Sequence, residues 1–412
     1  MSALRTRVPV IIDTDPGVDD VVAILLAIAS PELEILAYNI TYGNTDLESS
    51  YVNIFKVYRA IELHLKKYPE HKARFPNFDP THKPVLVRGA AGPLEGELHS
   101  AQYFHGRDGL GNITELHPEL NFENMPATHP YLELSQKSGV EVSLDILKAR
   151  PARSVTYIAL GPLTNLALLM RADSQLVTDR IGRIVCMGGA LDVPGNTSPM
   201  AEFNFFADPY AVKELLISTD LHKGLPLERF VMLPLDITTS HELPFPVYKK
   251  HVDPAFDTSN NPSIAADKAP VIHFTSSFLE RTREVMVSFG KDAMELHDIA
   301  AVWCAIANPP LEDGAPTTLT TGWDGVHRIF DVERTGEITR GMLVIDRREN
   351  EGAYPLGANR SEAQREPHEL GQPSEAELLR RGVLCISSTP GPSTLLEILL
   401  SRVWGVSYSS PS

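Results

Sequence analysis

The sequence predicts an α/β fold: a mainly parallel, Rossmann-like open sheet with helices on both faces. Short runs rich in β-branched residues alternate along the chain with segments of helical periodicity. These runs are almost continuously apolar, which is typical of strands covered on both faces. The 412 residues, 43% of them hydrophobic, are enough to bury a large core. We therefore expect residues 1–412 to form one α/β domain.

The predicted elements follow one another from the N-terminus. The first strand, Val8–Ile12, leads into a helix over Val18–Ala29, and the second, Leu33–Thr41, leads into a helix over roughly Glu48–Leu65. The further predicted strands are Pro84–Arg88, Ser154–Leu160, Arg183–Met187, Phe230–Ile237 and Val383–Ser387. A last amphipathic helix, Ser393–Trp404, is expected to pack back on the core.

Two polar segments interrupt this alternation. Lys66–Lys83 is basic and contains proline, and Arg347–Arg381 is charged and poor in apolar residues. Neither has enough apolar side chains to form a core of its own. We predict that both are exposed surface insertions in the domain.

Charge and cysteine content exclude several classes of partner. The net charge is −16, from 37 Lys+Arg against 53 Asp+Glu, so neither nucleic acid nor an anionic membrane surface is expected. The apolar run Val21–Ala29 is far shorter than the about 20 residues that span a bilayer. Ser2–Arg7 is short and polar, which does not resemble a secretory signal. Cys186, Cys304 and Cys385 lie far apart and are odd in number, which favours free thiols and a cytoplasmic location.

The most informative stretch follows the first predicted strand. In Asp13–Asp20, read as Asp-Thr-Asp-Pro-Gly-Val-Asp-Asp, four carboxylates occupy eight residues. Helix capping would use one or two of them, and four would repel one another unless a cation neutralised them. Asp15 in the turn and Asp20 in the helix can face one point, and no Cys or His lies nearby. The pattern favours a hard divalent cation held by oxygen atoms and disfavours zinc.

Polar residues also follow other predicted strands. Asn44, Thr164, Asn165 and the segment Met187–Gly189 each lie just past the end of a strand. Taken singly, such residues are often only turns. Because ligands of open parallel sheets bind beyond the carboxyl ends of the strands, we expect these residues to converge on one cleft there.

Two further segments place polar residues in apolar surroundings. Ala201–Phe205 alternates polar and aromatic side chains, which fits either an edge strand with its polar side in water or part of a site. Asn196 precedes it in a loop. His297-Asp298 stands before a helix that runs to about Ala307, where an Asp can be an ordinary N-cap.

Together these residues resemble a known family. Asp13–Asp20 is similar to the amino-terminal signature of the nucleoside hydrolases, which include the inosine–uridine-preferring nucleoside N-ribohydrolases. The likeness continues through Phe104–Gly111, which resembles the family's flexible active-site loop, and through Gly161–Asn165, Met187–Gly189, Ala201–Asn204, His297-Asp298 and Gly336–Asp346. The resemblance implies a calcium-dependent hydrolase that cleaves the N-glycosidic bond of ribonucleosides to free base and ribose. It also implies a homodimer or homotetramer.

The resemblance assigns roles to particular residues. It implies that Ca²⁺ is bound by Asp15, Asp20, Asp298 and the main-chain carbonyl of Thr164, with Asp15 also the general base for the attacking water. It implies that ribose is held by Asp19, Asn44, Asn196, Glu202 and Asn204, with Met187 close to the sugar. His297 would assist the departing base, and His105 lies in the loop that closes over substrate. Because the base leaves poorly unless it is protonated, either His297 or His105 could be the catalytic proton donor. The spacing from Met187 to Asn196 is one residue longer than the family pattern leads us to expect.

Elementary chemistry supports this assignment. Breaking a ribosyl C–N bond develops oxocarbenium-like charge, which a carboxylate-rich floor stabilises. Two alternatives stay open at this point. A haloacid-dehalogenase-like phosphatase also places Asp-x-Asp after its first strand, although the Asp19-Asp20 pair has no role in that scheme. A non-catalytic nucleoside-binding protein on the same scaffold is the other.

Overall fold

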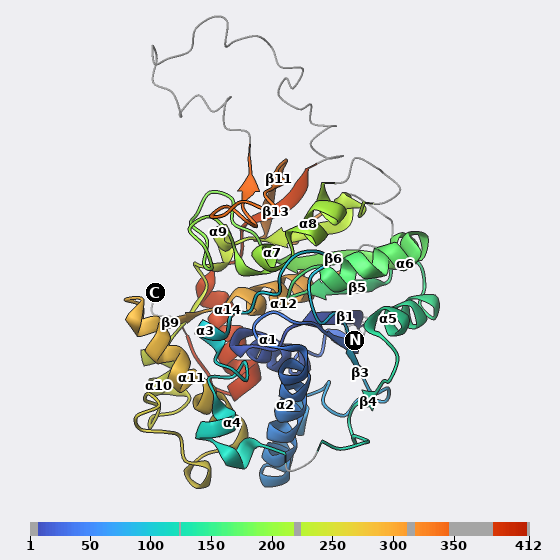
Figure 1. The fold of residues 1–412 in the computed structure, drawn as a ribbon. Coiled ribbons are helices and arrows are strands. Elements are labelled where there is room, and N and C mark those ends of the chain that lie inside the picture. The colour runs from blue at the N-terminus through green and yellow to red at the C-terminus, as the bar shows by residue number, and fades with distance from the viewer. Residues whose placement is uncertain (1–6, 123–124, 218–223, 311–317, 346–381, 410–412) are drawn as a thin grey trace, which may run out of the picture.

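The computed structural model describes residues 7–122, 125–217, 224–310, 318–345 and 382–409. Its centre is a nine-stranded sheet of order β10-β13-β7-β6-β5-β1-β2-β3-β4 (Figure 1). The strands are β1 Val8–Thr14, β2 Leu33–Ile40, β3 Val85–Arg88, β4 Glu133–Leu134, β5 Val155–Ala159, β6 Ile181–Met187, β7 Phe230–Leu233, β10 Asp324–Arg328 and β13 Val383–Ser388. Adjacent strands run parallel, except for the antiparallel edge pair β10 and β13. The predicted mainly parallel α/β sheet is confirmed.

Helices and two small antiparallel strand pairs surround this sheet. The helices are α1 Val18–Ile28, α2 Leu47–Lys67, α3 Gln102–His105, α4 Ile113–Leu116, α5 Gly139–Lys148, α6 Thr164–Arg180, α7 Phe203–Ala207, α8 Pro209–Leu216, α9 Leu235–Thr238, α10 Phe245–His251, α11 Pro270–Ser288, α12 His297–Ala307 and α14 Pro392–Leu399. The 3₁₀ turns are η1 Pro69–Arg74, η2 Pro118–Leu120, η3 Leu227–Arg229 and η4 Ala265–Asp267. The small pairs are β8 Glu242–Pro244 with β9 Ala293–Glu295, and β11 Asp331–Val332 with β12 Leu343–Val344.

The first strand shows why the sheet is covered on both faces. Successive side chains of a strand point to opposite faces. Val10 and Ile12 belong to a core that includes residues of α1, α2, α11 and α12, whereas Ile11 belongs to a second core with residues of α5, α6 and α8. Figure 1 shows α5 and α6 on one side of the sheet and α1, α2 and α11 on the other. An almost continuously apolar strand is therefore buried on both of its faces.

Strand order creates a crevice beside β1. This strand pairs with β2 on one side and with β5 on the other, so the sheet extends in two directions from it. Such a reversal of strand order is where open α/β sheets bind ligands, beyond the carboxyl ends of the strands. The acidic segment Asp13–Asp20 begins in the last two residues of β1 and continues beyond it, and Gly161–Asn165 follows β5. The two segments therefore meet at this point.

Two predicted elements differ in their boundaries from the prediction. The predicted strand Phe230–Ile237 stops at Leu233, because Pro234 has no N–H for the sheet ladder and instead precedes the short helix α9. The C-terminal helix starts at Pro392, a favoured first position, and turns into one π-helical segment, η7, at Leu400–Trp404.

The segment Lys66–Lys83 is only partly exposed. Its Phe75, Asn77 and Phe78 are buried. The Asn77 Nδ2 donates hydrogen bonds to the carbonyls of Ala27 (3.0 Å) and Ser30 (2.7 Å), so the segment is anchored to the end of α1. The other predicted insertion, Arg347–Arg381, lies outside the described residues.

The three thiols are structural. Cys186, Cys304 and Cys385 are all buried and free. Burial raises the pKa of the Cys304 thiol to about 12, so it stays protonated and is a poor nucleophile. Among the residues that the structure describes, no helix is both long and apolar enough to cross a membrane.

Candidate active site

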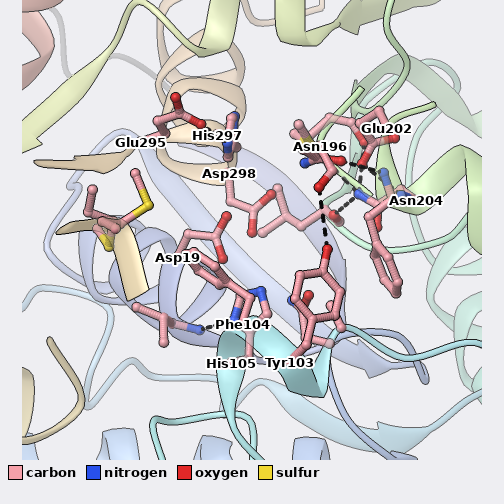
Figure 2. A pocket seen from close by; sticks show the side chains of 18 of the residues that line it. Asp19, Tyr103, Phe104, His105, Asn196, Glu202, Asn204, Glu295, His297 and Asp298 are labelled. Atoms are coloured by element: carbon pink, nitrogen blue, oxygen red, sulfur yellow. Dashed lines mark hydrogen bonds and ion pairs between the residues drawn. The ribbon is translucent and has the colours of Figure 1, made fainter. Parts of the chain in front are cut away.

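A pocket opens at the carboxyl ends of the central strands (Figure 2). Nine of the residues predicted for the site line it: Asp19, Asn44, His105, Met187, Asn196, Glu202, Asn204, His297 and Asp298. The carboxylates of Asp19 and Asp298 point toward each other in Figure 2, and Glu202 and Asn204 lie across the pocket from Asp19. Asp15 and Asp20 are fully buried and do not line this pocket.

The turn between β1 and α1 packs the carboxylates closely. Oxygen atoms of Asp19, Asp20 and Asp298 lie within 4.8 Å of one another. Asp15 lies on the same turn, and its Oδ2 accepts the backbone N–H of Asn44 at 2.7 Å. Its Oδ1, like Oδ1 of Asp19, is buried with no hydrogen-bond partner among the described residues. Two buried carboxylate oxygens are thus left without a donor.

Helix capping explains only one of these acids. The Asp20 Oδ2 accepts the Gly17 N–H (3.1 Å) and the Asn44 Nδ2 (2.7 Å), and its Oδ1 accepts the Thr14 hydroxyl (2.5 Å). Asp20 therefore closes the turn and caps α1, as the capping alternative proposes. Capping does not explain the unpartnered oxygens of Asp15 and Asp19.

Burial and mutual repulsion make this cluster costly to ionise. Burial, followed by the charge of Asp20, raises the pKa of Asp15 well above its usual range. The same two causes raise the pKa of Asp19 to about 7, and burial with the neighbouring acids raises that of Asp298. A divalent cation would remove both penalties. Because these donors are carboxylate oxygens, the cluster fits a hard cation such as Ca²⁺ or Mg²⁺.

Asp13 has a different environment from the other acids of its segment. Its Oδ2 accepts the Tyr157 hydroxyl (2.7 Å) and its Oδ1 accepts the Asn165 Nδ2 (2.8 Å). Asn165 also accepts the Ala90 N–H at 2.7 Å. Asp13 and Asn165 therefore hold β1, β5 and the chain after β3 together, and neither lines the pocket.

Ala201–Phe205 is not an edge strand. Glu202 caps α7, and its Oε1 accepts the Asn204 N–H at 2.7 Å while its Oε2 accepts the Gly189 N–H at 2.8 Å. Glu202 is only 2% exposed. The alternative in which these polar residues face water is therefore wrong.

Asn204 and Asn196 complete this wall of the pocket. The Asn204 Nδ2 donates to the carbonyls of Leu160 (2.6 Å) and Met187 (3.2 Å), so it links the ends of β5 and β6. The Asn196 Oδ1 accepts the Phe203 N–H at 3.0 Å. This bond brings the loop before α7 to the pocket despite its extra residue.

The structure does not bring Thr164 to the pocket. Thr164 is the first residue of α6, and its hydroxyl donates to Asp208 Oδ2 at 2.6 Å. Leu160 lines the pocket instead. A Cβ atom on Gly161 would lie 2.5 Å from Asp15 Oδ1, so the turn directly after Leu160 is the one that Asp15 faces. Which residue of this segment lies at the acidic cluster depends on sheet register, which residue spacing alone does not provide.

His297 lies in the pocket wall with both ring nitrogens engaged. Its Nδ1 is 2.8 Å from Thr238 Oγ1 and its Nε2 is 3.0 Å from Glu295 Oε2. Although burial lowers the pKa of His297, Glu295 raises it above the usual value. Although burial raises the pKa of Glu295, His297 and Lys291 lower it to about 2. Glu295 therefore favours the protonated form of His297, which can donate a proton.

His105 has an environment of the opposite kind. Its Nδ1 accepts the backbone N–H of Val18 at 3.1 Å, at the start of α1. Burial, and then the charge of His297, lowers the pKa of His105 to about 3. His105 is therefore neutral near pH 7, which argues against its predicted role as a proton donor.

One wall of the pocket contains residues beyond the predicted site residues, although Phe104 belongs to the predicted active-site loop Phe104–Gly111. Tyr103 and Phe104 from α3, with Met286, Phe289 and Met294, give it apolar and aromatic surface. Phe289 is 66% exposed and Tyr103 is 55% exposed, which is unusual for large apolar side chains. In the sequence these residues resemble the apolar positions of ordinary amphipathic helices. Only their position at the pocket mouth distinguishes them.

The fold and pocket define a class of protein: an α/β enzyme with a carboxylate-floored site at the switch point of a parallel sheet. The family model described as inosine-uridine preferring nucleoside hydrolase matches residues 10–368. The chain therefore belongs to this family and is a hydrolase of nucleosides. Membership of this family excludes the alternative of a haloacid-dehalogenase-like phosphatase.

Individual relatives agree with this family. The chain is 33% identical over 339 residues to the pyrimidine-specific ribonucleoside hydrolase RihA of Salmonella enteritidis, covering 82% of this chain and 88% of that protein. It is 29% identical over 351 residues to the inosine-uridine preferring nucleoside hydrolase of Leishmania major, covering 85% and 90%. The solved structure of an inosine-guanosine nucleoside hydrolase has the same fold, with a TM-score of 0.64 at 23% identity over 98% of this chain and all of that one.

Proposed function

We propose that this chain hydrolyses the N-glycosidic bond of ribonucleosides to free base and ribose, with Ca²⁺ bound at the acidic cluster. The observation that carries the proposal is the set of buried carboxylates below the pocket, two of which have an oxygen without a partner. Such a set is costly in a protein that has no cation to bind. The pocket above this set has polar groups that suit a sugar and an aromatic wall that suits a base.

Asp15, Asp20 and Asp298 are the proposed side-chain ligands. For the main-chain ligand we propose the carbonyl of Leu160 in place of Thr164, because the turn directly after Leu160 is the one that Asp15 Oδ1 faces. When bound, Ca²⁺ would neutralise the carboxylates and accept oxygen ligands from water and sugar hydroxyls. Oxygen-only donors explain why calcium is preferred to zinc in this proposal.

Asp15 is the proposed general base. The Asn44 N–H holds its Oδ2, which leaves Oδ1 free to accept a proton from water. The negative charge of Asp19 and Glu202 would stabilise the positive charge that develops on the ribose as the C–N bond breaks. Asp19, Asn44, Asn196, Glu202 and Asn204 would hydrogen-bond the ribose hydroxyls, with Met187 beside the ring.

A nucleoside panel tests the function directly. We expect free ribose from inosine, uridine or both. The 2′-deoxy forms should be cleaved much more slowly, because the missing hydroxyl leaves a buried polar group of the protein without a hydrogen-bond partner. Free ribose is measured with a reducing-sugar assay. Both purine and pyrimidine ribonucleosides belong in the panel, since this chain is similar to a pyrimidine-specific hydrolase and to an inosine-uridine preferring one. Binding of these nucleosides without ribose release would instead support the non-catalytic alternative.

His297 is the proposed acid for the departing base. His297→Ala should slow cleavage of inosine or uridine by roughly 10²-fold or more, because these bases leave poorly without a proton. It should leave nitrophenyl riboside cleavage nearly intact, because nitrophenolate departs without one. The two substrates, assayed on the same variant, control for misfolding. Equal slowing of both would assign His297 to packing or to ribose binding, and slowing of neither would exclude it as the acid.

The resemblance and composition also lead us to propose a homodimer or homotetramer located in the cytoplasm. Three buried free thiols are typical of a reducing compartment. The net charge of −16 leads us to expect no nucleic-acid partner.

A further inference from the structure

A second group of metal-ligating side chains lies outside the pocket. His117, next to η2, and His273, on α11, are 2% and 3% exposed, and Glu119 of η2 lies between them. One ligand atom from each of these three residues lies within 4.8 Å of the other two. We call these residues the His117–Glu119–His273 cluster. Nothing in the proposed hydrolysis uses them.

The distances from Glu119 to the two histidines suit a zinc ligand set. The Glu119 Oε1 is 3.2 Å from His117 Nδ1 and 2.9 Å from His273 Nε2. Two ligands bonded to one tetrahedral zinc ion, at about 2.0–2.1 Å each, are about 3.3 Å apart. Only small side-chain movements would be needed to place an ion between the three atoms.

The outer nitrogen of each histidine is also held. His117 Nε2 lies 3.3 Å from Glu280 Oε2, and His273 Nδ1 lies 3.0 Å from Ser263 Oγ. Glu280 is 1% exposed, and its Oε1 is occupied by the Ser263 N–H at 2.6 Å. Metal-bound histidines in proteins are oriented by such acceptors, which fix the tautomer that presents the other nitrogen to the ion.

The local charge favours a divalent cation. Glu119, Glu280 and Asp253 carry negative charge, and Lys268 supplies one positive charge through contacts with Asp253 (2.6 Å) and Ser263 (2.8 Å). Two negative charges remain, which a divalent ion would balance. Without metal, a proton on His117 shared with Glu119 and Glu280 partly fills this role, so a hydrogen-bonded network is the competing explanation.

We infer that His117, Glu119 and His273 form a zinc-binding site separate from the proposed calcium site. Two imidazoles and one carboxylate are zinc ligands, unlike the oxygen-only cluster below the pocket. The Glu119 side chain is 43% exposed, which leaves room for ion access and for a water as fourth ligand. The ion would fasten the segment after α4 to α11, whose C-terminal end carries Met286 of the pocket wall.

Metal titration of the full chain tests the inference. The chain is stripped with a chelator, saturated with Ca²⁺ to fill the carboxylate cluster, and titrated with Co²⁺. We expect one Co²⁺ per chain with visible absorption bands of four-coordinate cobalt, and loss of those bands on addition of Zn²⁺. Zn²⁺ should also raise the unfolding temperature, since it binds only the folded chain.

Matched variants separate the cluster from other sites. Glu119→Ala should weaken Zn²⁺ binding at least 10-fold, whereas Glu115→Ala, which removes another exposed acid of the same segment, should not change it. Ser263→Ala removes an acceptor behind a ligand and should weaken binding about 10–100-fold. Both Glu variants change exposed side chains and should fold normally. Absence of cobalt bands, or equal Zn²⁺ affinity in the two Glu variants, would overturn the inference and leave a hydrogen-bonded network.

Discussion

Asp15→Asn is expected to lower kcat by more than the ~10²–10⁴-fold typical of losing one acid–base group. Two roles would fail together, because asparagine cannot accept the proton from water and is a weaker ligand for Ca²⁺. The change keeps the shape of the side chain, and Asn44 can still donate its N–H to the Oδ atom. Steady-state release of ribose from the best substrate of the panel measures the effect.

Asp13→Asn provides a matched control for this variant. It replaces another buried carboxylate of the same segment, but one that contacts Tyr157 and Asn165 and does not line the pocket. It should reduce stability while leaving turnover largely intact. If Asp15→Asn kept near-normal kcat with calcium bound, Asp15 would not be the base.

Removal of calcium is expected to abolish activity. Without the ion, burial and the neighbouring acids raise the pKa values of the partly buried Asp19 and of the buried Asp15 and Asp298, so the cluster tends to take up protons and lose its charge. We expect elemental analysis to find one tightly held Ca²⁺ per chain, chelation to reduce ribose release to background, and added Ca²⁺ to restore it. Unfolding temperature should rise with Ca²⁺, by mass action.

Asp298→Asn distinguishes the proposed ligand set from nonspecific calcium binding. It should weaken Ca²⁺ binding strongly, because Asp298 faces Asp19 and Asp20 from a distant part of the chain. Asp292→Asn, which changes an exposed acid in the preceding segment, should not weaken Ca²⁺ binding. A calcium-free preparation with full activity after exhaustive chelation would contradict the role of the metal.

Much of the architecture was predictable because it depends on local patterns. Continuous apolar runs predicted the central strands, since a strand buried on both faces cannot carry polar side chains at alternate positions. The errors fall where a single residue changes the backbone. Pro234 ends β7 before α9, and Glu202 starts a helix where alternation alone also fitted a strand.

The sequence alone was enough to indicate the family and to locate the acidic signature. Asp13–Asp20 is contiguous, and the repulsion among its clustered carboxylates favours a bound cation. That reasoning needs only the covalent order of the chain and the repulsion between like charges. The sequence therefore predicted a cation-binding cluster in this segment before any contact was known.

Only the tertiary structure decided how distant residues share the site. The pairing of β1 with β5 places Leu160, not Thr164, at the pocket, and the packing of α12 brings Asp298 to Asp19 and Asp20. The His117–Glu119–His273 cluster likewise joins segments more than 150 residues apart. Such contacts depend on strand order and side-chain direction, which are set by packing over the whole core and leave no periodic signal in any one segment.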